Sequence, residues 1–423
     1  MQELTKLIYE DMKPALGVTE PGAIAFATAK AKSYTKGEIK KVSVSLNSGM
    51  YKNAFTCGIP NSTHVGNSFA AALGVIAGDS DKGLESLDGV KESDNLKAQE
   101  MIDAGIVEAK LSSITPDIYI EATVETDLDS CTVLIKGSHT NIVKITVNGK
   151  VIFEKEEKKS QEKNEEQALI HKYSLEQIVN YIKSVDIKEI EFIKKAYSMN
   201  CDLFQEALKS SKTTFIHQLL KNNNNEIISK DVVKTAQLLC NGAIEGRVIG
   251  LDKPAMSITG SGAHGIIATM PLLAEQKVKN LTEEKLLRAT ALSYLVCMYI
   301  KEYSGRLSAF CGCGIAAGTG MACGILYMRD GSLEQMKYCI NNMASSITGM
   351  ICDGGNQGCT MKGILAVDIA FRSVEFALNN VYVYDVHGIN GKTPEATMRN
   401  MGMIASPGMV ETEKTIIDIF ENK

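Results

Sequence analysis

The sequence has little of several residue types, and each shortage narrows the range of functions. Tryptophan is absent, and aromatic residues make up only 6% of the 423 residues. Neither sign of charge dominates, because 45 lysines and arginines stand against 50 aspartates and glutamates. A balance of this kind provides no basic surface for nucleic acid or for an anionic membrane. We therefore expect neither partner.

The sequence also lacks the signals of exported and membrane proteins. Its opening residues, MQELTKLIYEDMK, are charged and amphipathic, whereas a secretory signal needs an apolar core. Eleven cysteines without such a signal are typical of a reducing cytoplasm, which is where we expect the protein. One uncharged stretch runs from Leu307 to Met328. Its glycines and cysteines favour a buried, close-packed helix or turn-helix over a membrane span.

Hydrophobic periodicity predicts an α+β fold. Period-two alternation predicts a strand at KKVSVSLNS and several antiparallel strands from about 107 to 155. Helices are expected at the start, after Pro21 and through Asn67, and again near 176–184, 187–210 and 230–247.

Two domains follow from this division. Residues 1–170 are predicted to form a mixed region with a small antiparallel sheet that contributes to an active-site cleft. Residues 171–423 are predicted to form a mainly α-helical domain. The charged run KEEKKSQEKNEEQ at 155–167 is typical of a solvated linker between them.

Two cysteine clusters are the strongest chemical signal in the chain. Cys311 and Cys313 lie in SAFCGCGIAAGTGMACG, and Cys352 and Cys359 enclose DGGNQG, with a predicted helical hairpin between the pairs. Grouped thiolates are soft-metal ligands, and glycine lets the backbone bend close to a cluster. The spacing matches neither ferredoxin runs nor zinc knuckles, so separate turns would have to assemble a cluster. The alternative is that these are small, reduced thiols packed between helices.

A glycine-rich segment, Gly260-Ser-Gly-Ala-His-Gly265, matches the G-x-G-x-x-G pattern of dinucleotide-binding proteins. Its context disagrees, because a poor strand containing Pro254 precedes it and Pro271 falls where the crossover helix should be established. We favour a glycine turn whose backbone amides bind an anion such as a substrate carboxylate.

Four strings in this sequence resemble the signature blocks of one family, and they occur in the expected order over nearly the whole chain. They are PALGVTEPGAIAFA, ITGSGAHGIIATMP, GRLSAFCGCGIAAGTGMACG and GMICDGGNQGCTMKG. The chain is similar to the cysteine desulfidase family (UPF0597-type), which is related to the iron–sulfur L-serine dehydratases.

This resemblance implies a [4Fe-4S] cluster held by three cysteines, with one open iron that acts as a Lewis acid. By motif, the ligands would be Cys352, Cys359 and one of the CGC pair, with Cys313 favoured over Cys311. The implied reaction is α,β-elimination from a small amino acid, giving a 2-oxo acid, ammonia and either sulfide or water. A metal with an exchangeable site suits the departure of thiolate or hydroxide.

Three positions depart from the family pattern. The usual GCTEP reads GVTEP here, with Val18 in place of a cysteine proposed as a base or an extra ligand. The usual GSGNQG reads GSGAHG, which introduces Ala263 and His264. A GAK-like string after ICD is replaced by GGNQ at 354–357. The cluster ligands are unaffected, and the choice of substrate stays open.

Proton transfer has three candidate residues, each with a plainer alternative. Glu20 begins a helix, where a carboxylate is also an ordinary N-terminal charge. His264 suits acid–base work near neutral pH, or is a hydrogen-bonded loop histidine. Lys362 is retained because pyridoxal phosphate, which needs a lysine, is another route to this elimination. The candidate substrate-binding residues are Thr19, Ser261, Gly262, His264, Arg306 and Asn356.

The sequence thus predicts an iron–sulfur lyase acting on a small amino acid, and a homodimer stays open. A different class is also considered: a non-catalytic iron–sulfur or thiol-based sensor, disabled by the change at Val18. Measured turnover would separate the two. His64, in a polar turn, is a further residue that we consider for lining a cleft between the two regions.

Overall fold

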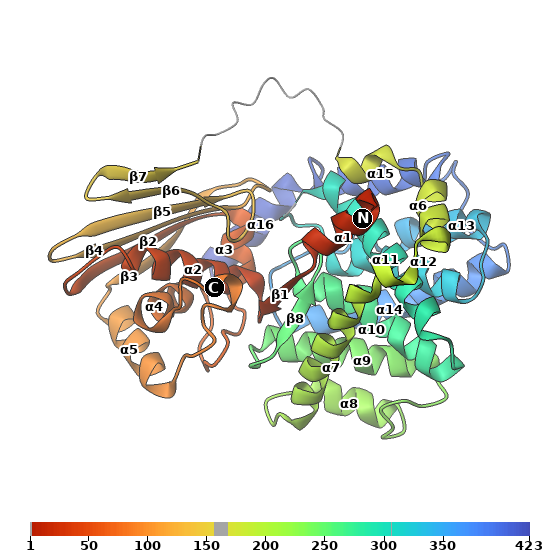
Figure 1. Cartoon of the computed structure of the whole chain (residues 1–423), viewed down its shortest axis with the longest axis horizontal. Coiled ribbons are helices and arrows are strands. Elements are labelled where there is room, and N and C mark those ends of the chain that lie inside the picture. Colours follow the sequence, from red (N-terminus) through yellow and green to blue (C-terminus); the bar gives the residue numbers. More distant parts are fainter. Residues whose placement is uncertain (1, 156–167, 306) are drawn as a thin grey trace.

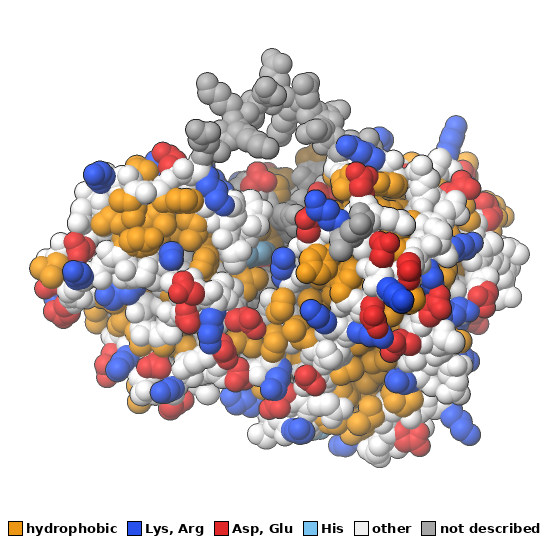
Figure 2. Space-filling model, in the orientation of Figure 1, with side chains coloured by type: hydrophobic (Ala, Val, Ile, Leu, Met, Phe, Trp, Pro, Cys, Tyr) orange, Lys and Arg blue, Asp and Glu red, His pale blue; other side chains and the backbone are white. Residues whose placement is uncertain are grey.

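The computed structural model describes residues 2–155, 168–305 and 307–423. Two lobes are evident in Figure 1, one built on a six-stranded sheet and the other composed almost entirely of helices. The surface between the lobes is hollowed on the face seen in Figure 2. This architecture confirms the α+β fold class predicted from periodicity.

The sheet has the strand order β3-β2-β4-β5-β6-β7. Its strands are β2 (Ile39–Asn47), β3 (Val107–Ser113), β4 (Tyr119–Thr126), β5 (Ser130–Lys136), β6 (Ile142–Val147) and β7 (Lys150–Glu154). All neighbours are antiparallel except β2 and β3, which are parallel. The sequence predicted only antiparallel strands. The parallel pair arises because a long helical crossover separates β2 from β3 in the chain.

Helices cover one face of this sheet. The crossover contains α3 (Ser48–Ala54), α4 (Asn67–Ala77) and α5 (Glu92–Asp103), and α2 (Thr19–Lys32) precedes β2. Along α2 nearly every side chain is buried, because its small residues allow close packing against α4, β4 and β5. The N-terminus of this central helix is therefore fixed firmly beside the second lobe.

The second lobe is a group of packed helices. They are α6 (Leu175–Ser184), α7 (Lys194–Lys209), α8 (Phe215–Asn222), α9 (Val232–Val248), α10 (Gly262–Lys279), α11 (Glu283–Ser304), α12 (Gly318–Met328), α13 (Leu333–Ile347), α14 (Gly358–Leu378) and α15 (Pro394–Ala405). The stretch from Leu307 to Met328 is buried, as predicted, and α12 and α13 form the expected hairpin. None of the helices in the described ranges is long and apolar enough to cross a membrane.

Segments from both ends of the sequence connect the lobes (Figure 1). α1 (Glu3–Asp11) packs on α11, and β1 (Lys13–Leu16) pairs with β8 (Pro254–Ser257) in a two-stranded antiparallel sheet. α16 (Val410–Glu421) returns to pack on α3. The domain boundary at residue 170 stays a prediction. The proposed linker lies outside the described residues except for Lys155.

The glycine-rich motif forms the end of the turn after β8 and the first turn of α10, so the strand–turn–helix order of a dinucleotide site is present. Pro271 lies inside α10, which corrects the expectation that no helix would be established there. The β8 strand nevertheless pairs with β1 alone and in the antiparallel sense. A dinucleotide fold requires a parallel sheet at this place, and the described residues form none.

Candidate active site

The two cysteine segments are adjacent in space although a helical hairpin separates them in sequence. The Cys311 amide donates to the Met350 carbonyl at 3.0 Å, and the Cys352 amide donates to the Ala309 carbonyl at 2.6 Å. These bonds form an isolated antiparallel bridge. The bridge places Cys311 and Cys352 on neighbouring backbone strands.

The other two cysteines lie at irregular helix beginnings. Cys313 starts a π-helical turn that leads into α12, a feature common at functional sites. Cys359 lies in the first turn of α14, where the helix dipole favours a thiolate. Its Sγ lies 3.5 Å from the Gly354 carbonyl oxygen.

The four thiols are close enough to act on each other's ionisation. A hydrogen bond with Cys313 lowers the pKa of Cys311 to about 7, whereas burial opposes that shift. The same hydrogen bond, followed by burial, raises the pKa of Cys313. Burial raises the pKa of Cys352 and brings that of Cys359 to about 12. The structure thus brings together all four cysteines that the sequence singled out.

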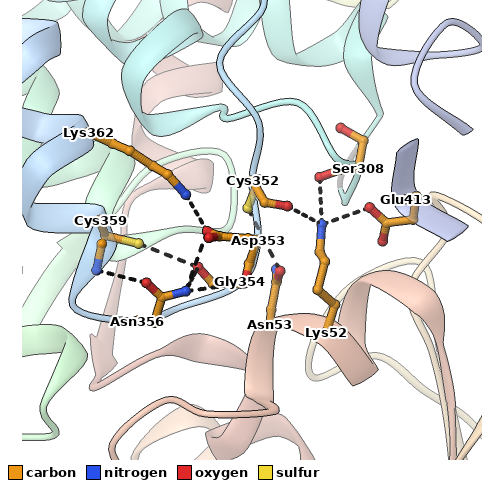
Figure 3. Close-up of polar contacts among 11 residues, drawn as sticks. Lys52, Asn53, Ser308, Cys352, Asp353, Gly354, Asn356, Cys359, Lys362 and Glu413 are labelled. Carbon is orange, nitrogen blue, oxygen red and sulfur yellow. Dashed lines mark hydrogen bonds and ion pairs between the residues drawn. The ribbon is translucent and has the colours of Figure 1, made fainter. Parts of the chain in front are cut away.

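A buried lysine ties both cysteine segments to the rest of the fold (Figure 3). The Nζ atom of Lys52, on α3, donates to the carbonyls of Ser308 at 3.1 Å and Cys352 at 2.8 Å. It also pairs with Glu413 of α16 at 2.7 Å. No local sequence signal distinguishes Lys52 from a surface lysine, because its partners are more than 250 positions away.

The loop between Cys352 and Cys359 is ordered by its own side chains. The Oδ1 atom of Asn356 accepts from the Gly358 amide at 2.8 Å, and its Nδ2 donates to the Asp353 carbonyl at 3.2 Å. Lys362 contacts the Asp353 carboxylate (Figure 3). Burial lowers the pKa of Lys362, but Asp353 and the nearby thiols raise it more strongly, so the lysine stays protonated.

A small cleft of about 70 Å³ opens beside the cysteine bridge. Its lining contains five residues that the sequence singled out: Glu20, Ser261, His264, Cys313 and Cys352. Asn53, His139, Thr259 and Lys301 also line it and were missed by sequence reasoning. Such a small volume suits a small metabolite rather than a nucleotide.

Glu20 is buried in this cleft at the N-terminus of α2. Its carboxylate accepts from Asn53 Nδ2 at 2.9 Å and Thr19 Oγ1 at 3.0 Å, and His139 Nε2 lies 3.7 Å away. Burial raises the pKa of Glu20, but His139, Asn53 and Arg247 together lower it to about 2. Glu20 is therefore an anion at neutral pH.

His139 lies in the turn between β5 and β6 and is buried beside Glu20. Its Nε2 atom is buried without a hydrogen-bond partner in the described structure. A lone histidine in a polar turn gives no sequence signal of this position.

His264 is buried in the first turn of α10. Its Nδ1 lies 2.6 Å from Thr259 Oγ1, which donates to the Ile258 carbonyl at 2.8 Å. Because that hydroxyl proton is committed, we assign the proton to Nδ1 and a lone pair to Nε2. Nε2 lies against Gly312, the residue between Cys311 and Cys313 in the sequence. Burial, with Lys301 and Arg247, lowers the pKa of His264 well below its usual value, so the imidazole is neutral.

The remaining candidates are placed differently. Gly262 does not line the cleft; it packs against Arg247, next to the cleft residue Ser261. Asn356 faces a second cleft of about 490 Å³ on the other side of the cysteine loop, together with His64. Arg306 lies outside the described residues.

Two departures from the family pattern touch one another. A Cβ atom at Gly355 would lie 2.8 Å from Val18 Cγ1, so only glycine fits beside this valine. The position of the missing cysteine thus faces the loop between Cys352 and Cys359. The fully buried thiol of Cys57 is also near enough for the charges of Glu20 and Cys359 to act on it.

Within the described ranges, no three side chains of histidine, cysteine, aspartate or glutamate are grouped to hold a metal ion. A four-iron cluster places iron and sulfide between its ligands, so its cysteines need not converge as closely as those around one ion. The donor set of four thiols, in contact with glycine-rich backbone, matches the chemistry of such a cluster.

Comparison with known proteins identifies the family. Residues 81–418 match the sequence profile of the serine dehydratase alpha chain. A UPF0597 protein of Clostridium botulinum strain Hall is 42% identical over 424 residues, covering 98% of this chain and 97% of that protein. UPF0597 proteins of Caldanaerobacter subterraneus and Clostridioides difficile are 36% and 32% identical, and each comparison covers 98% or more of both chains. This chain therefore belongs to the serine dehydratase alpha chain family.

Proposed function

We propose that this protein is an iron–sulfur-dependent lyase that catalyses α,β-elimination from a small amino acid. The reaction would be a desulfhydration or a dehydration, giving a 2-oxo acid, ammonia and sulfide or water. The main support is the bridge between the two cysteine segments, at the edge of a cleft that also contains His264 and Glu20. A cytoplasmic location and a homodimer stay predictions.

Three cysteines would hold a [4Fe-4S] cluster: Cys352, Cys359 and Cys313, or Cys311 in place of Cys313. A cluster with one open iron supplies a Lewis acid that stabilises the leaving thiolate or hydroxide. Lys362 and Lys52 lie near these thiols and offset their negative charge. Because Lys362 stays protonated against Asp353, we assign it this electrostatic role rather than that of a base.

His264 is our choice for the base that removes the α-proton. Its neutral imidazole has a lone pair on Nε2, and the Nδ1 hydrogen bond to Thr259 fixes the ring in place. Glu20 is unsuited to this step because its low pKa makes its carboxylate a weak base. We assign to the Glu20 carboxylate the binding of the substrate ammonium group.

The alternative function is a non-catalytic iron–sulfur or thiol-based sensor. The observation that favours it is Val18, which occupies the position of a family cysteine and faces the cysteine loop. A valine there provides neither a base nor a ligand. The two functions differ in one measurable property, which is turnover.

The test is anaerobic purification with iron reconstitution, followed by visible absorption and assays of 2-oxo acid and ammonia. The substrate panel contains cysteine, serine and threonine in their L- and D-forms. Oxygen-labile turnover with an iron–sulfur absorption band is expected. A brown protein without turnover would favour the sensor, and a colourless protein that binds no iron would reject both the lyase and an iron–sulfur sensor.

Substitution of the ligands tests the cluster directly. Cys352→Ser and Cys359→Ser are expected to lose iron, because serine is a poor ligand for this cluster. Cys240→Ser is the matched control, since Cys240 is a fully buried thiol on α9 outside the cysteine group. Full iron content in the first two variants would show that the assignment is wrong.

His264→Ala tests the base. We expect a rate loss of roughly 10²- to 10⁴-fold with iron retained. Since the pKa of His264 is depressed, the wild-type rate should fall only at pH values well below 6.5, where the imidazole gains its proton. An unchanged rate across pH in the alanine variant would remove His264 from the mechanism.

A further inference from the structure

Arg247 is a buried arginine that no motif singled out. It lies in the last turn of α9, and the residue is only 4% exposed. In the described parts of the chain its guanidinium donates no hydrogen bond, and no carboxylate lies within ion-pairing distance. The Nε atom is fully buried without a partner. Burial of an unpaired charge is strongly unfavourable, so a buried guanidinium needs an anion.

The described parts of the protein stabilise the positive charge of the Arg247 guanidinium only weakly. The C-terminal end of α9 is favourable for a positive charge, but this effect is worth only about 0.3–1 kcal/mol at exposed sites. The charge of Arg247 acts on Glu20, but the carboxylate accepts its hydrogen bonds from Asn53 and Thr19 rather than from the guanidinium. Glu20 therefore acts on Arg247 from a distance without accepting its hydrogen bonds.

The guanidinium lies against the beginning of α10. A Cβ atom placed on Gly262 would meet Arg247 Nε at 2.8 Å and Cδ at 3.2 Å, so glycine is required for this contact. α10 has 18 residues, and no side chain caps its N-terminus. Its first amides and its positive dipole end therefore lie beside the arginine, and both features favour an anion.

The position of Arg247 and of the start of α10 beside the cleft indicates which kind of anion they bind. Ser261, the residue before Gly262, lines the cleft, and so do Glu20 and His264, on which the charge of Arg247 acts. We propose that Arg247 and the uncapped amides of α10 bind the carboxylate of the amino-acid substrate. Glu20 would then hold the ammonium group, and the two charges of the zwitterion would fix the position of the α-carbon.

This inference rests on the proposed lyase for the identity of its ligand. The probe is therefore L-alanine, which has the α-carboxylate and ammonium groups but no β-substituent to eliminate. Binding is measured by anaerobic calorimetry on the iron-loaded protein. Alaninamide, which lacks the carboxylate, serves as the comparison ligand.

Wild-type protein is expected to bind L-alanine and to discriminate against alaninamide. Arg247→Gln should weaken L-alanine binding by roughly 10- to 100-fold, the range for a hydrogen bond to a charged group. Its binding of alaninamide should not weaken, because that ligand offers no carboxylate to the arginine. Arg247→Lys keeps the positive charge but lacks the planar guanidinium, so its affinity for L-alanine should lie between those of the wild type and Arg247→Gln.

Arg329→Gln is the matched control. Arg329 is also largely buried, but both its Nε and Nη2 donate to Glu275, at 2.8 and 2.9 Å, away from the cleft. Its loss should lower stability and leave L-alanine binding unchanged. If Arg247→Gln does not fold, Gly262→Ala decides the question, because its Cβ atom would push the guanidinium away from α10.

Several outcomes would overturn the proposal. These are unchanged L-alanine affinity in a folded Arg247→Gln or Gly262→Ala variant, and absence of L-alanine binding by the wild type. The lyase is judged separately. Arg247-dependent binding without turnover on the substrate panel would keep the carboxylate site and reject the lyase. Turnover with unchanged KM in Arg247→Gln would support the lyase and reject the carboxylate site.

Discussion

Single residues at this site are constrained chiefly by what they touch. Gly312 separates two cysteines, and a Cβ atom there would lie 2.6 Å from His264 Nε2. Contacts this close do not occur between real side chains, so the imidazole would have to move. Gly312 thus leaves the space that the His264 imidazole occupies in the cleft.

Gly312→Ala is therefore expected to slow turnover at least about tenfold, because it displaces the proposed base without removing any thiol. Gly349→Ala is the matched control, since a Cβ atom at Gly349 meets nothing within 4 Å. Both variants should keep their iron. The measurement is kcat together with iron content, and equal kcat in the two variants would contradict this placement of His264.

At the scale of elements, one helix depends on a carboxylate from another. Glu245 of α9 is fully buried and accepts from three amides at the start of α8: Thr214 at 2.6 Å, Phe215 at 3.0 Å and Ile216 at 2.8 Å. The first amides of a helix have no partners within the helix, so this side chain satisfies them from outside.

Glu245→Ala should lower the free energy of unfolding by roughly 3 kcal/mol, because it leaves buried amides without acceptors. Asp231→Ala is the comparison: it removes the ordinary N-cap of α9, whose bonds to Val233 and Lys234 are 3.1 Å long, and should cost about 1 kcal/mol. Hydrogen exchange of the α8 amides measures the effect locally. Slow exchange at 214–216 in the alanine variant would refute it.

Local periodicity was enough to predict most of these elements. The strand at KKVSVSLNS, the strands between 107 and 155 and the helix after Pro21 were predicted because each buries one face or packs small residues. The cysteine grouping was also predictable, because its residue types are unusual. The parallel pairing of β2 with β3 was missed because hydrophobic periodicity predicts strands but does not show in which direction two strands pair.

The missed site residues share one property. Arg247, His139 and Lys52 acquire their surroundings only through tertiary packing, and each looks like an ordinary surface residue in sequence. Nothing within a few positions of Lys52 indicates that it becomes buried, because Ser308, Cys352 and Glu413 come from other segments.

At the scale of the whole molecule, the Lys52–Glu413 pair joins the sheet lobe, both cysteine segments and α16. Lys52→Met should destabilise the protein by roughly 3–5 kcal/mol, because it leaves the Glu413 carboxylate buried and uncompensated. Adding Glu413→Leu should recover part of this loss. The exposed pair Lys82–Asp88, at 2.8 Å, is the control, and Lys82→Met should change stability by less than about 1 kcal/mol.

Chemical denaturation of the wild type, Lys52→Met, Glu413→Leu and the double variant completes a double-mutant cycle. Additive losses from the two single changes would show that the ion pair is not coupled and that the connection comes from apolar packing alone. Phe55 and Phe420, which stack at 5.0 Å between the same elements, would then be the main link.

The same pair fixes an order of events during biosynthesis. A ribosome makes Lys52 early, both cysteine segments later, and Glu413 after all of them. Until residue 413 has left the exit tunnel, the ammonium that joins the carbonyls of Ser308 and Cys352 lacks its carboxylate. If the cysteines hold the proposed cluster, we therefore expect iron to enter only after residue 413 has left the ribosome, and a nascent chain arrested before α16 should take up no iron.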